Sequence, residues 1–389
     1  NMMPFPVRDC PVEDALGCVL RENLAAERDQ PPFDRVCMDG IALSFEAWER
    51  GQREYGCEGV QAAGHPQLTL ANAENCIEVM TGAMLPVGCD TVVRVEDTQR
   101  RGSVVHVDGD AKVVQWQNVH KRGTDHLKGA LLLPSGQRLG APEIGIAASV
   151  GKAKVSVANE PAVAVVSTGD ELVDFDGPLA PYQIRRSNAF AVKAMFEDAG
   201  FRKVDTHHGP DNEVELEEIL RACLAKYGVL VLSGGVSMGK FDYVPRVLEK
   251  LGVRCVFHRV AQRPGKPLWF GVGPEGQPVF GLPGNPVSTL VCCRRYVIKH
   301  LLAALGLQER LPLTPALSRE VQFKPALTLF LSVRLDSDAG GVLQAVPAPT
   351  NTSGDYAALA GTDGFIELPA DMDVFHENTA APVYLWRLK

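Results

Sequence analysis

Residues 277–306 read QPVFGLPGNPVSTLVCCRRYVIKHLLAALG, and this stretch decides the fold class of the chain. A short apolar run, a tight turn and a long segment of helical spacing follow one another, which predicts a strand, a turn and a helix. The same order occurs twice more between residues 159 and 276. Apolar strands that alternate with helices are typical of a parallel sheet covered by helices on both faces. We therefore predict a doubly wound α/β domain over residues 159–308.

Start and stop signals set the bounds of the predicted helices. Asn212 and Glu215 have the spacing of a capping box, and Gly228 is a typical stop. Asn285 is a suitable cap and Pro286 fits the first helical position. The helix that starts at residue 187 is also expected to begin with a cap. The expected strands are residues 161–169, 229–235 and 277–282, and the expected helices are residues 187–200, 212–228, 243–252 and 286–306.

The rest of the chain divides into further predicted regions. Residues 10–27 carry apolar side chains at helical spacing, which predicts a short helix. Short β-type runs broken by Gly, Pro and Asn predict a small β domain over residues 45–120. The Gly-rich residues 121–158 are expected to belong with the N-terminal residues 1–44, which makes the β domain an insertion. Residues 309–389 return to β-rich sequence and predict a separate small β domain, so the chain is expected to be multidomain, α/β plus β.

Composition and cysteine usage exclude several classes of protein. The chain has 389 residues, 46% hydrophobic and 22% charged, which is typical of a soluble globular protein with several cores. The formal net charge of −8 argues against binding to nucleic acid or to an anionic membrane. The ten cysteines form no C-x-x-C pair, which indicates reduced thiols and a cytoplasmic location rather than disulfides or a zinc site. No apolar run reaches membrane length, so we expect no membrane span.

Three turns of the predicted α/β domain are rich in small residues. They are residues 167–171 (STGDE), 233–239 (SGGVSMG) and 282–286 (LPGNP). The carboxyl ends of the strands in such a sheet meet at one edge, where ligands bind. Exposed backbone N–H groups and a helix N-terminus could hold an anion there, although Gly and Asn in any one turn could serve only turn geometry and capping. Three such turns on one edge favour an anion site.

The second of these turns resembles a nucleotide-binding loop without matching it. Gly234, Gly239 and Lys240 fit G-x-x-x-x-G-K, but Phe241 stands where a Ser or Thr would hold magnesium. Asp242 follows, and it could hold a divalent cation or act as a base. We therefore disfavour an ATP-binding P-loop and keep a nucleotide-dependent phosphotransferase only as a weaker alternative.

Charged side chains close to Gly in the sequence could serve an anion site. Each acid alone is typical of a solvated or capping turn residue, but carboxylates clustered near phosphate loops would bind magnesium. Each cation alone is typical of a solvated surface, but an oxyanion substrate would need several. The acids are Asp39, Asp125, Asp170, Glu171 and Asp211, and the cations are Arg259, Arg263 and Lys266.

Nine short motifs occur in order across most of the chain. They are PPFDRVCMDGIA (31–42), TGAMLPVGCDTVVRVEDT (81–98), RGTDHLKGA (122–130), STGDEL (167–172), QIRRSN (183–188), SGGVSMGKFD (233–242), PGKP (264–267), GLPGNPVS (281–288) and TSG (352–354). Each motif alone is weak, but their joint order and spacing are specific. Together they resemble the molybdopterin molybdotransferases, or molybdenum insertases, a family that includes the gephyrin E domain.

The resemblance implies an L-shaped homodimer with four domains in each chain. These would be an elongated linking and dimerisation domain, the inserted β domain, a molybdopterin-binding α/β domain and a C-terminal β-barrel. The implied reaction inserts molybdate into adenylylated molybdopterin with the help of magnesium, and releases AMP and molybdenum cofactor. The site would be shared between subunits, with the MDG segment of one chain facing the α/β domain of the other. The expected partners are a second subunit, the pterin substrate and, as a candidate, the adenylyltransferase that makes this substrate.

The resemblance also implies roles for individual residues. Arg259, Arg263 and Lys266 would attract the molybdate dianion, because the geometry of a guanidinium suits an oxyanion. The implied catalytic acids are Asp39, Asp125, Glu171, Asp211 and Asp242, of which Glu171 and Asp242 would hold magnesium. The implied binding residues are Thr81, Ser233, Gly234, Gly235, Ser237, Gly239, Lys266, Pro283, Gly284, Asn285 and Ser353.

Four positions depart from the family pattern. Val36 and Ile41 stand where a Ser and an aromatic residue are usual around the MDG segment. Arg186 replaces an acid in the RRSN motif, and Ser332 stands where an Arg is expected in the C-terminal domain. These changes leave two alternatives open. One is a pterin-binding paralogue or scaffold with impaired catalysis, and the other is an insertase for another oxyanion such as tungstate.

Overall fold

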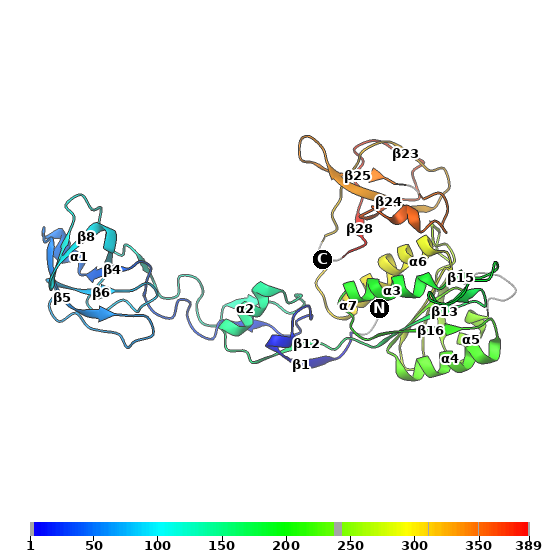
Figure 1. Ribbon diagram of the computed structural model, residues 1–389, viewed down its shortest axis with the longest axis horizontal. Helices are drawn as coiled ribbons and strands as arrows, with labels where there is room; N and C mark the ends of the chain where they lie inside the picture. Colours follow the sequence, from blue (N-terminus) through cyan, green and yellow to red (C-terminus); the bar gives the residue numbers. More distant parts are fainter. Residues whose placement is uncertain (1–3, 237–242, 310, 349, 388–389) are drawn as a thin grey trace. The chain divides into compact units, whose positions relative to one another are not determined.

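The chain forms two compact units, which are described separately. The computed structural model describes residues 4–236, 243–309, 311–348 and 350–387 (Figure 1). The predicted linking domain contributes residues to both units, and the four-domain division stays a prediction. The large unit consists of Asn1–Glu22, Ser135–Gly140 and Lys154–Lys389, and the small unit consists of Asn23–Pro134 and Ala141–Ala153.

A six-stranded sheet lies at the centre of the α/β part of the large unit. Its order is β16-β13-β17-β21-β20-β18, and the first four strands are parallel, which confirms the doubly wound prediction. The prediction of an all-parallel sheet is wrong at one edge, where β20 and β18 run antiparallel. The edge strand β18 is largely exposed, and the prediction recognised strands only by the continuous apolar runs that buried strands carry. The strands are β13 (Val163–Thr168), β16 (Val204–Gly209), β17 (Val229–Ser233), β18 (Arg254–His258), β20 (Trp269–Val272) and β21 (Pro278–Leu282).

Alternate side chains of the parallel strands enter two separate cores. Val163 and Val165 of β13 lie in one core, and Ala164 and Val166 lie in the other. A strand buried on both faces needs an apolar residue at every position, which explains the continuous apolar run. Helices α3, α6 and α7 cover the first face, and α4 and α5 cover the second (Figure 1). The helices are α3 (Ser187–Asp198), α4 (Glu213–Lys226), α5 (Val244–Lys250), α6 (Pro286–Cys292) and α7 (Lys299–Ala304).

The starts of the helices agree only in part with the predictions. Asn212 caps α4 as predicted, because its side chain accepts the N–H groups of Val214 and Glu215 at 3.0 and 3.3 Å. Asn285 occupies the cap position of α6, but its side chain donates to Ser353 Oγ at 2.9 Å instead. The predicted capping bond at Asn285 is therefore wrong, since a tertiary neighbour binds the side chain. No side-chain cap forms at the start of α3 within the described residues either.

The long helix predicted over residues 286–306 is confirmed, with one irregularity. A π-helical segment, Cys293–Ile298, joins α6 to α7, so the three pieces run as one helix. Within the ranges that the structure describes, neither this helix nor any other is long and apolar enough to cross a membrane.

The C-terminal part of the large unit is a sheet that closes on itself. Its strand order is β22-β25-β24-β26-β28, and its two ends meet because Ala316 of β22 forms an antiparallel bridge with Ala380, just before β28. This closure agrees with the implied β-barrel. A short strand of the α/β part, β19 (Gln262–Arg263), pairs in parallel with β24 and brings Arg263 to the barrel. The barrel strands are β22 (Ala316–Leu317), β24 (Thr328–Ser337), β25 (Leu343–Pro347), β26 (Gly364–Leu368) and β28 (Val383–Leu385).

The small unit contains a second six-stranded sheet, in the order β7-β4-β6-β5-β9-β8. Its cores bury Leu43, Tyr55 and Ile77. The first and last strands of the unit are antiparallel partners, since β3 pairs with β10 and β2 pairs with β11. The elements are β2 (Leu24–Ala25), β3 (Arg35–Val36), β4 (Gly40–Leu43), α1 (Phe45–Glu49), β5 (Glu54–Gln61), β6 (Asn75–Val79), β7 (Thr91–Arg94), β8 (Thr98–Arg101), β9 (Val104–Val107), β10 (Val119–His120), β11 (Leu131–Leu133) and α2 (Ala141–Ser149).

The helix predicted over residues 10–27 is wrong. This segment starts within β1 (Val7–Pro11), which pairs with β12 (Lys154–Ala158) of the same unit. Further along, the N–H of Leu20 donates to the carbonyl of Gln137 at 2.9 Å. The backbone groups of this segment form hydrogen bonds with residues that are distant in the sequence. Such pairing outweighs the helical spacing of apolar residues on which the prediction rested.

Gly40 lies in the middle of the small unit's sheet, between β6 and β7. A Cβ atom at this position would lie 1.9 Å from the backbone oxygen of Val93. We expect Gly40→Ala to lower the free energy of unfolding by about 3 kcal/mol, measured by urea denaturation. Gly145→Ala is the matched control, because Gly145 is exposed within α2 with open space around it, and Ala stabilises such a position by about 1 kcal/mol. If Gly40→Ala unfolds with the same free energy as the wild type, the close approach of these strands is contradicted.

Candidate functional site

A cavity of about 600 Å³ lies at the carboxyl ends of β13 and β17, and we call it the switch-point cavity. The chain continues from β13 to β16 on one side, and β17 lies on the other side of β13. Ligands bind where the connections of a doubly wound sheet diverge in this way. The residues around the cavity include Ser167, Thr168, Glu171, Arg186, Asn188, Asp211, Ser233, Gly234, Gly235, Pro283, Gly284 and Asn285.

Two glycines after β17 leave room for a ligand at this cavity. Gly234 and Gly235 have φ angles of +97° and +66°, which favour glycine. A Cβ atom on Gly235 would lie 2.7 Å from a methyl group of Val244 and 2.8 Å from Thr168 Oγ1. Any larger residue would therefore be strained and would crowd the base of the cavity. The turn therefore keeps glycine at both positions, as is typical of anion-binding loops.

Several buried polar atoms at the cavity lack a hydrogen bond. They are Ser167 Oγ, Thr168 Oγ1, Arg186 Nε and Asn188 Oδ1, and none has a partner in the part of the chain that the structure describes. The side chains of Ser167 and Thr168 are 1% and 6% exposed. An unsatisfied buried group typically costs about 1–3 kcal/mol, so folded proteins keep few of them. Their concentration at one cavity indicates a site shaped for a polar ligand rather than for stability.

The side chain of Asn188 joins the loops around the cavity. Its Nδ2 atom lies 2.7 Å from the carbonyl oxygen of Gly284, 3.0 Å from Ser233 Oγ and 3.3 Å from Thr289 Oγ1. One amide therefore connects the start of α3 with the end of β17 and with the turn before α6. The relative position of these three segments depends on this residue.

Two of the predicted acids, Glu171 and Asp211, line the switch-point cavity. The loops that carry them are linked at Asp170, because its Oδ1 accepts the N–H of Asp211 at 3.0 Å. In return, the N–H of Asp170 donates to Asp211 Oδ2 at 3.4 Å. The structure therefore brings together two carboxylates from different loops at one cavity, beside the small residues that follow the strands.

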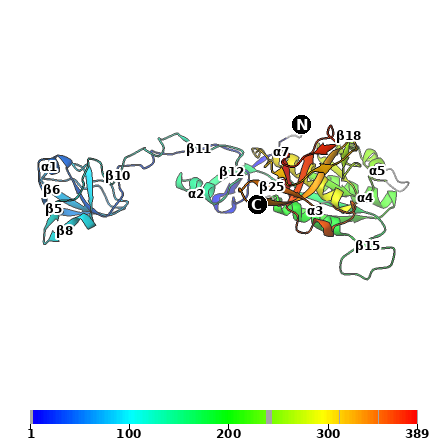
Figure 2. The same cartoon turned by 90° about the horizontal axis from the view of Figure 1, so that it is seen from above.

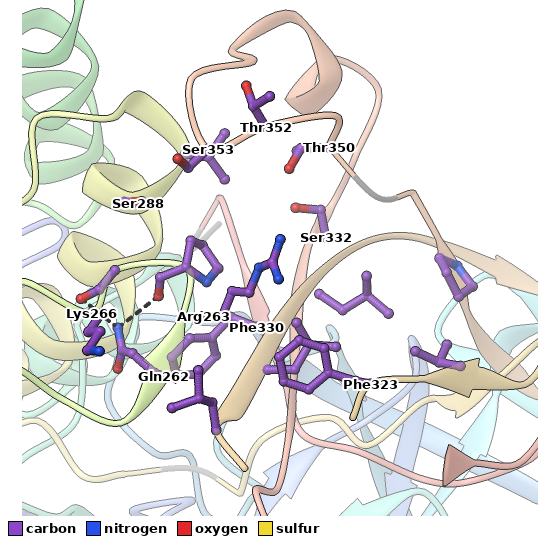
Figure 3. A pocket seen from close by; sticks show the side chains of 18 of the residues that line it. Gln262, Arg263, Lys266, Ser288, Phe323, Phe330, Ser332, Thr350, Thr352 and Ser353 are labelled. Carbon is purple, nitrogen blue, oxygen red and sulfur yellow. Dashed lines mark hydrogen bonds between the residues drawn. The ribbon is translucent and has the colours of Figure 1, made fainter. Parts of the chain in front are cut away.

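A second cavity, of about 730 Å³, lies between the α/β part and the barrel, and we call it the barrel-edge cavity (Figure 3). Arg263 extends into it with Ser332 and Thr350 nearby, and Lys266, Ser288 and Ser353 also line it. Pro267 and Asn285 line both cavities, so the two share a wall. The loop that carries the cations is fixed by the buried Gln262, whose Nε2 donates to the carbonyls of Pro264 and Gly265 at 3.1 and 3.3 Å.

The barrel-edge cavity has a positive charge. Arg263, Lys266 and Arg319 line it, against the single carboxylate of Glu320 among the described residues. Glu320 itself lies 3.1 Å from His376. Arg263 and Lys266 form no ion pair within the described ranges, so both charges are available to an anion. The cavity is cationic even though Ser332 stands where the family pattern has an Arg.

The other predicted acids lie in the small unit. Asp39 Oδ1 accepts hydrogen bonds from the N–H and the Oγ1 of Thr81, at 2.6 and 2.7 Å. The bond from the Thr81 hydroxyl, with the backbone bond beside it, lowers the pKa of Asp39 below its ordinary value. Asp39 is therefore ionised at neutral pH, and Thr81 is a partner of this predicted acid.

Asp125 is held by a chain of two side chains. Arg35 Nη2 lies 3.0 Å from His120 Nδ1, and His120 Nε2 lies 3.0 Å from Asp125 Oδ1. Because a guanidinium can only donate, His120 Nδ1 must accept, which leaves the ring proton on Nε2 to donate to the carboxylate. His120 therefore links Arg35 to Asp125 and orients the carboxylate.

The remaining predicted site residues are not brought to these cavities by any described contact. Arg259 lines neither cavity and has a φ angle of +77° in the turn after β18. Three predicted residues, Ser237, Gly239 and Asp242, lie outside the described residues, as does Lys240 of the near-match to a nucleotide-binding loop.

Sequence reasoning missed several residues of the two cavities. Thr168 and Asn188 lie within motifs that resemble the family, but neither carries a charge that would mark it as functional. Arg319 lies in no motif, and it reaches the barrel-edge cavity only because the barrel closes. A Ser, Thr or Asn directly after a strand or at the start of the next helix is the one signal that could have identified the first two.

The buried hydroxyl of Thr168 provides a test of the switch-point cavity. Because Oγ1 has no partner among the residues that the structure describes, Thr168→Val should raise the free energy of unfolding by about 1 kcal/mol. Thr289→Val is the matched control, because Thr289 Oγ1 donates to the carbonyls of Pro283 and Asn285 at 2.6 and 3.0 Å, and its loss should lower stability. Both are measured by urea denaturation. A loss of stability in Thr168→Val would show that the hydroxyl has a structural partner.

The bonds of Thr81 to Asp39 can be tested by titration. Thr81→Val removes the hydroxyl donor, so the pKa of Asp39 should rise toward the ordinary value of an aspartate, while Thr81→Ser should keep it low. The midpoint is measured by NMR of the carboxyl carbon. Since the folded pKa is depressed, these bonds add stability above the unfolded pKa, and this contribution is lost as pH falls through the folded value. An unchanged midpoint in Thr81→Val would contradict the assignment.

Family models match three stretches that cover most of the chain. Residues 2–151 match the MoeA N-terminal region (domain I and II), residues 164–303 match a probable molybdopterin binding domain, and residues 316–386 match the MoeA C-terminal region (domain IV).

Individual proteins agree with these models. A molybdopterin molybdenumtransferase of Synechocystis is 40% identical over 377 residues, which is 96% of this chain and 94% of that protein. One of Haemophilus influenzae is 33% identical over 80% of this chain and 76% of that protein. A crystal structure of a molybdopterin biosynthesis MoeA protein from Pyrococcus horikoshii matches 99% of this chain and 96% of its own, at 30% identity and a TM-score of 0.80. The chain therefore belongs to the molybdopterin molybdenumtransferase family.

Proposed function

We propose that this protein inserts molybdate into adenylylated molybdopterin and releases AMP and molybdenum cofactor. The observation that carries the proposal is the shared wall between a glycine-lined cavity at the sheet edge and a cationic cavity at the barrel. A transfer of this kind needs a diphosphate and an oxyanion close together. The names of the relatives, at up to 40% identity over nearly the whole chain, support the same activity.

The two cavities offer different binding groups to the two substrates. The diphosphate of the adenylylated pterin fits the switch-point cavity, where Gly234 and Gly235 carry no side chain and Ser167 and Thr168 offer hydroxyls. Molybdate, a compact dianion, fits the barrel-edge cavity beside Arg263 and Lys266. The shared wall at Asn285 then holds the oxyanion next to the pterin.

Release of AMP is a hydrolysis, in which a water oxygen bonds to the phosphorus of the adenylyl group, the anhydride bond between the two phosphates breaks, and negative charge collects on the phosphate that leaves. Backbone N–H groups and Arg side chains that are already in place stabilise such charge without reorganisation. Glu171 and Asp211 fit magnesium in kind, because this ion takes one or two carboxylates together with substrate phosphates and water. Magnesium, when bound there with Glu171 and the predicted ligand Asp242, would neutralise part of the phosphate charge.

Further parts of the proposal rest on the family resemblance. We infer a homodimer whose site receives the MDG segment of a second subunit, with Asp39 and Asp125 as additional acids. We also infer a cytoplasmic location, the four-domain division, and the adenylyltransferase that makes the substrate as a candidate partner. The pattern of cysteine thiols and the acidic net charge are consistent with this setting.

Release of AMP tests the proposed activity. The purified protein is incubated with adenylylated molybdopterin, molybdate and magnesium, and AMP is measured by chromatography. Wild-type protein should release AMP, and Glu171→Gln and Asp211→Asn should slow release by about 100-fold, as expected for groups that stabilise a transition state.

The control is Glu218→Gln, since Glu218 is an exposed carboxylate on α4 that lines neither cavity. It should release AMP at the wild-type rate. No release by the wild type from a substrate that a relative converts would overturn the proposed function. Tight retention of the pterin with no release would instead support the scaffold alternative.

A further inference from the structure

Arg186 is the residue of the switch-point cavity that the family resemblance does not explain. It lies directly before α3, at the end of an excursion that leaves β13 and carries β14 (Leu172–Val173) and β15 (Ile184–Arg185) (Figure 2). Its backbone is fixed, because its N–H donates to the carbonyl of Val173 at 2.9 Å. The side chain is only 12% exposed and lines the cavity.

The neighbouring Arg185 shows what a structural arginine does at this position. Its Nη1 atom donates to the carbonyls of Asp174 and Gly177, both at 2.6 Å, and so closes the base of the excursion. Arg186 makes no such bonds to the backbone. Its one described acidic partner is Asp174, whose Oδ1 accepts from Nη2 at 2.6 Å. Its Nε atom is buried and has no partner among the described residues.

The bond to Asp174 does not compensate for the burial of this charge. The Asp174 side chain is 63% exposed, and an ion pair with an exposed carboxylate contributes little stability because water screens it. The ring of Phe190 lies 5.6 Å from the guanidinium and packs against the side chain, but it accepts no hydrogen bond from Nε in the described structure. A nearly buried guanidinium with an unused donor is expected where an anion will bind.

The surroundings of Arg186 identify the kind of anion. The hydroxyls of Ser167 and Thr168 line the same cavity, are buried, and also lack hydrogen-bond partners within the described residues, so both can donate to a ligand. Together with the positive-φ turn at Gly234, they present several polar groups to one ligand. This arrangement suits a group with several acceptor oxygens, such as a phosphate, better than a single carboxylate.

We propose that Arg186 binds the phosphate of AMP, and of the adenylylated substrate, in the switch-point cavity. The inference rests on the proposed function and adds a residue to it. In the ligand-free protein the Nε atom is buried, so a ligand cannot reach it. The guanidinium therefore turns away from Asp174 and toward the phosphate when the ligand binds. The acid that the family pattern has here is replaced by a cation, so part of the phosphate charge is neutralised by the protein without metal.

Binding of AMP without magnesium tests this role. Dissociation constants are measured by calorimetry for wild type, Arg186→Gln, Arg186→Lys and Asp174→Asn, with circular dichroism to confirm that each is folded. Arg186→Gln should weaken binding about 10-fold or more, as the loss of a charge-assisted hydrogen bond predicts, and Arg186→Lys should recover part of the affinity. Asp174→Asn should bind AMP as tightly as the wild type or more tightly, because the guanidinium is released.

Each other outcome is decisive. Equal affinity of Arg186→Gln and wild type would overturn the role of Arg186, and the proposed function would stand if the wild type still releases AMP. A loss in Asp174→Asn equal to that in Arg186→Gln would also overturn it, because the pair would then act by ordering the excursion. A wild type that neither binds AMP nor releases it from the substrate would overturn both proposals.

Discussion

Strands β13, β17 and β21 are buried on both faces, and this burial leaves only their ends accessible to a ligand. Alternate residues of β13 from Val163 to Val166 enter two different cores, so these positions are apolar. Polar side chains appear only at the carboxyl ends of β13 and β17, at Ser167, Thr168 and Ser233, and in the turns that follow. The position of the switch-point cavity is thus a consequence of how the sheet is buried.

The site is maintained at a cost in stability. Ser167 and Thr168 keep buried hydroxyls without partners in the described structure, and Gly234 and Gly235 hold backbone conformations that few other residues tolerate. The hydrogen bonds of Asn188 counteract this cost by joining three segments. A polar cavity of this kind is stable because the two apolar cores on either side of the sheet are large.

Local charge, rather than net charge, matches this acidic protein to anionic substrates. The chain has a formal net charge of −8, yet the cations Arg263, Lys266 and Arg319 gather at one cavity and Arg186 lies in the other. Arg263 reaches the barrel because β19 pairs with β24. The cavity is therefore cationic although Ser332 carries no charge, and it is suited to an oxyanion.

The sequence by itself determined the elements that depend on local pattern. The doubly wound domain and its three turns rich in small residues were predicted from the apolar runs of β13, β17 and β21 and from the cap at Asn212. The family was predicted from the order of the nine motifs. Only the tertiary structure decided where backbone and side chains find distant partners. It prevented a helix over residues 10–27, where Cys10 and Pro11 pair with β12 and Leu20 binds Gln137. It also gave the side chain of Asn285 a hydrogen bond to Ser353 in place of a capping bond. It also placed Arg186 and Arg319 at cavities, because burial and charge compensation depend on neighbours that are remote in sequence.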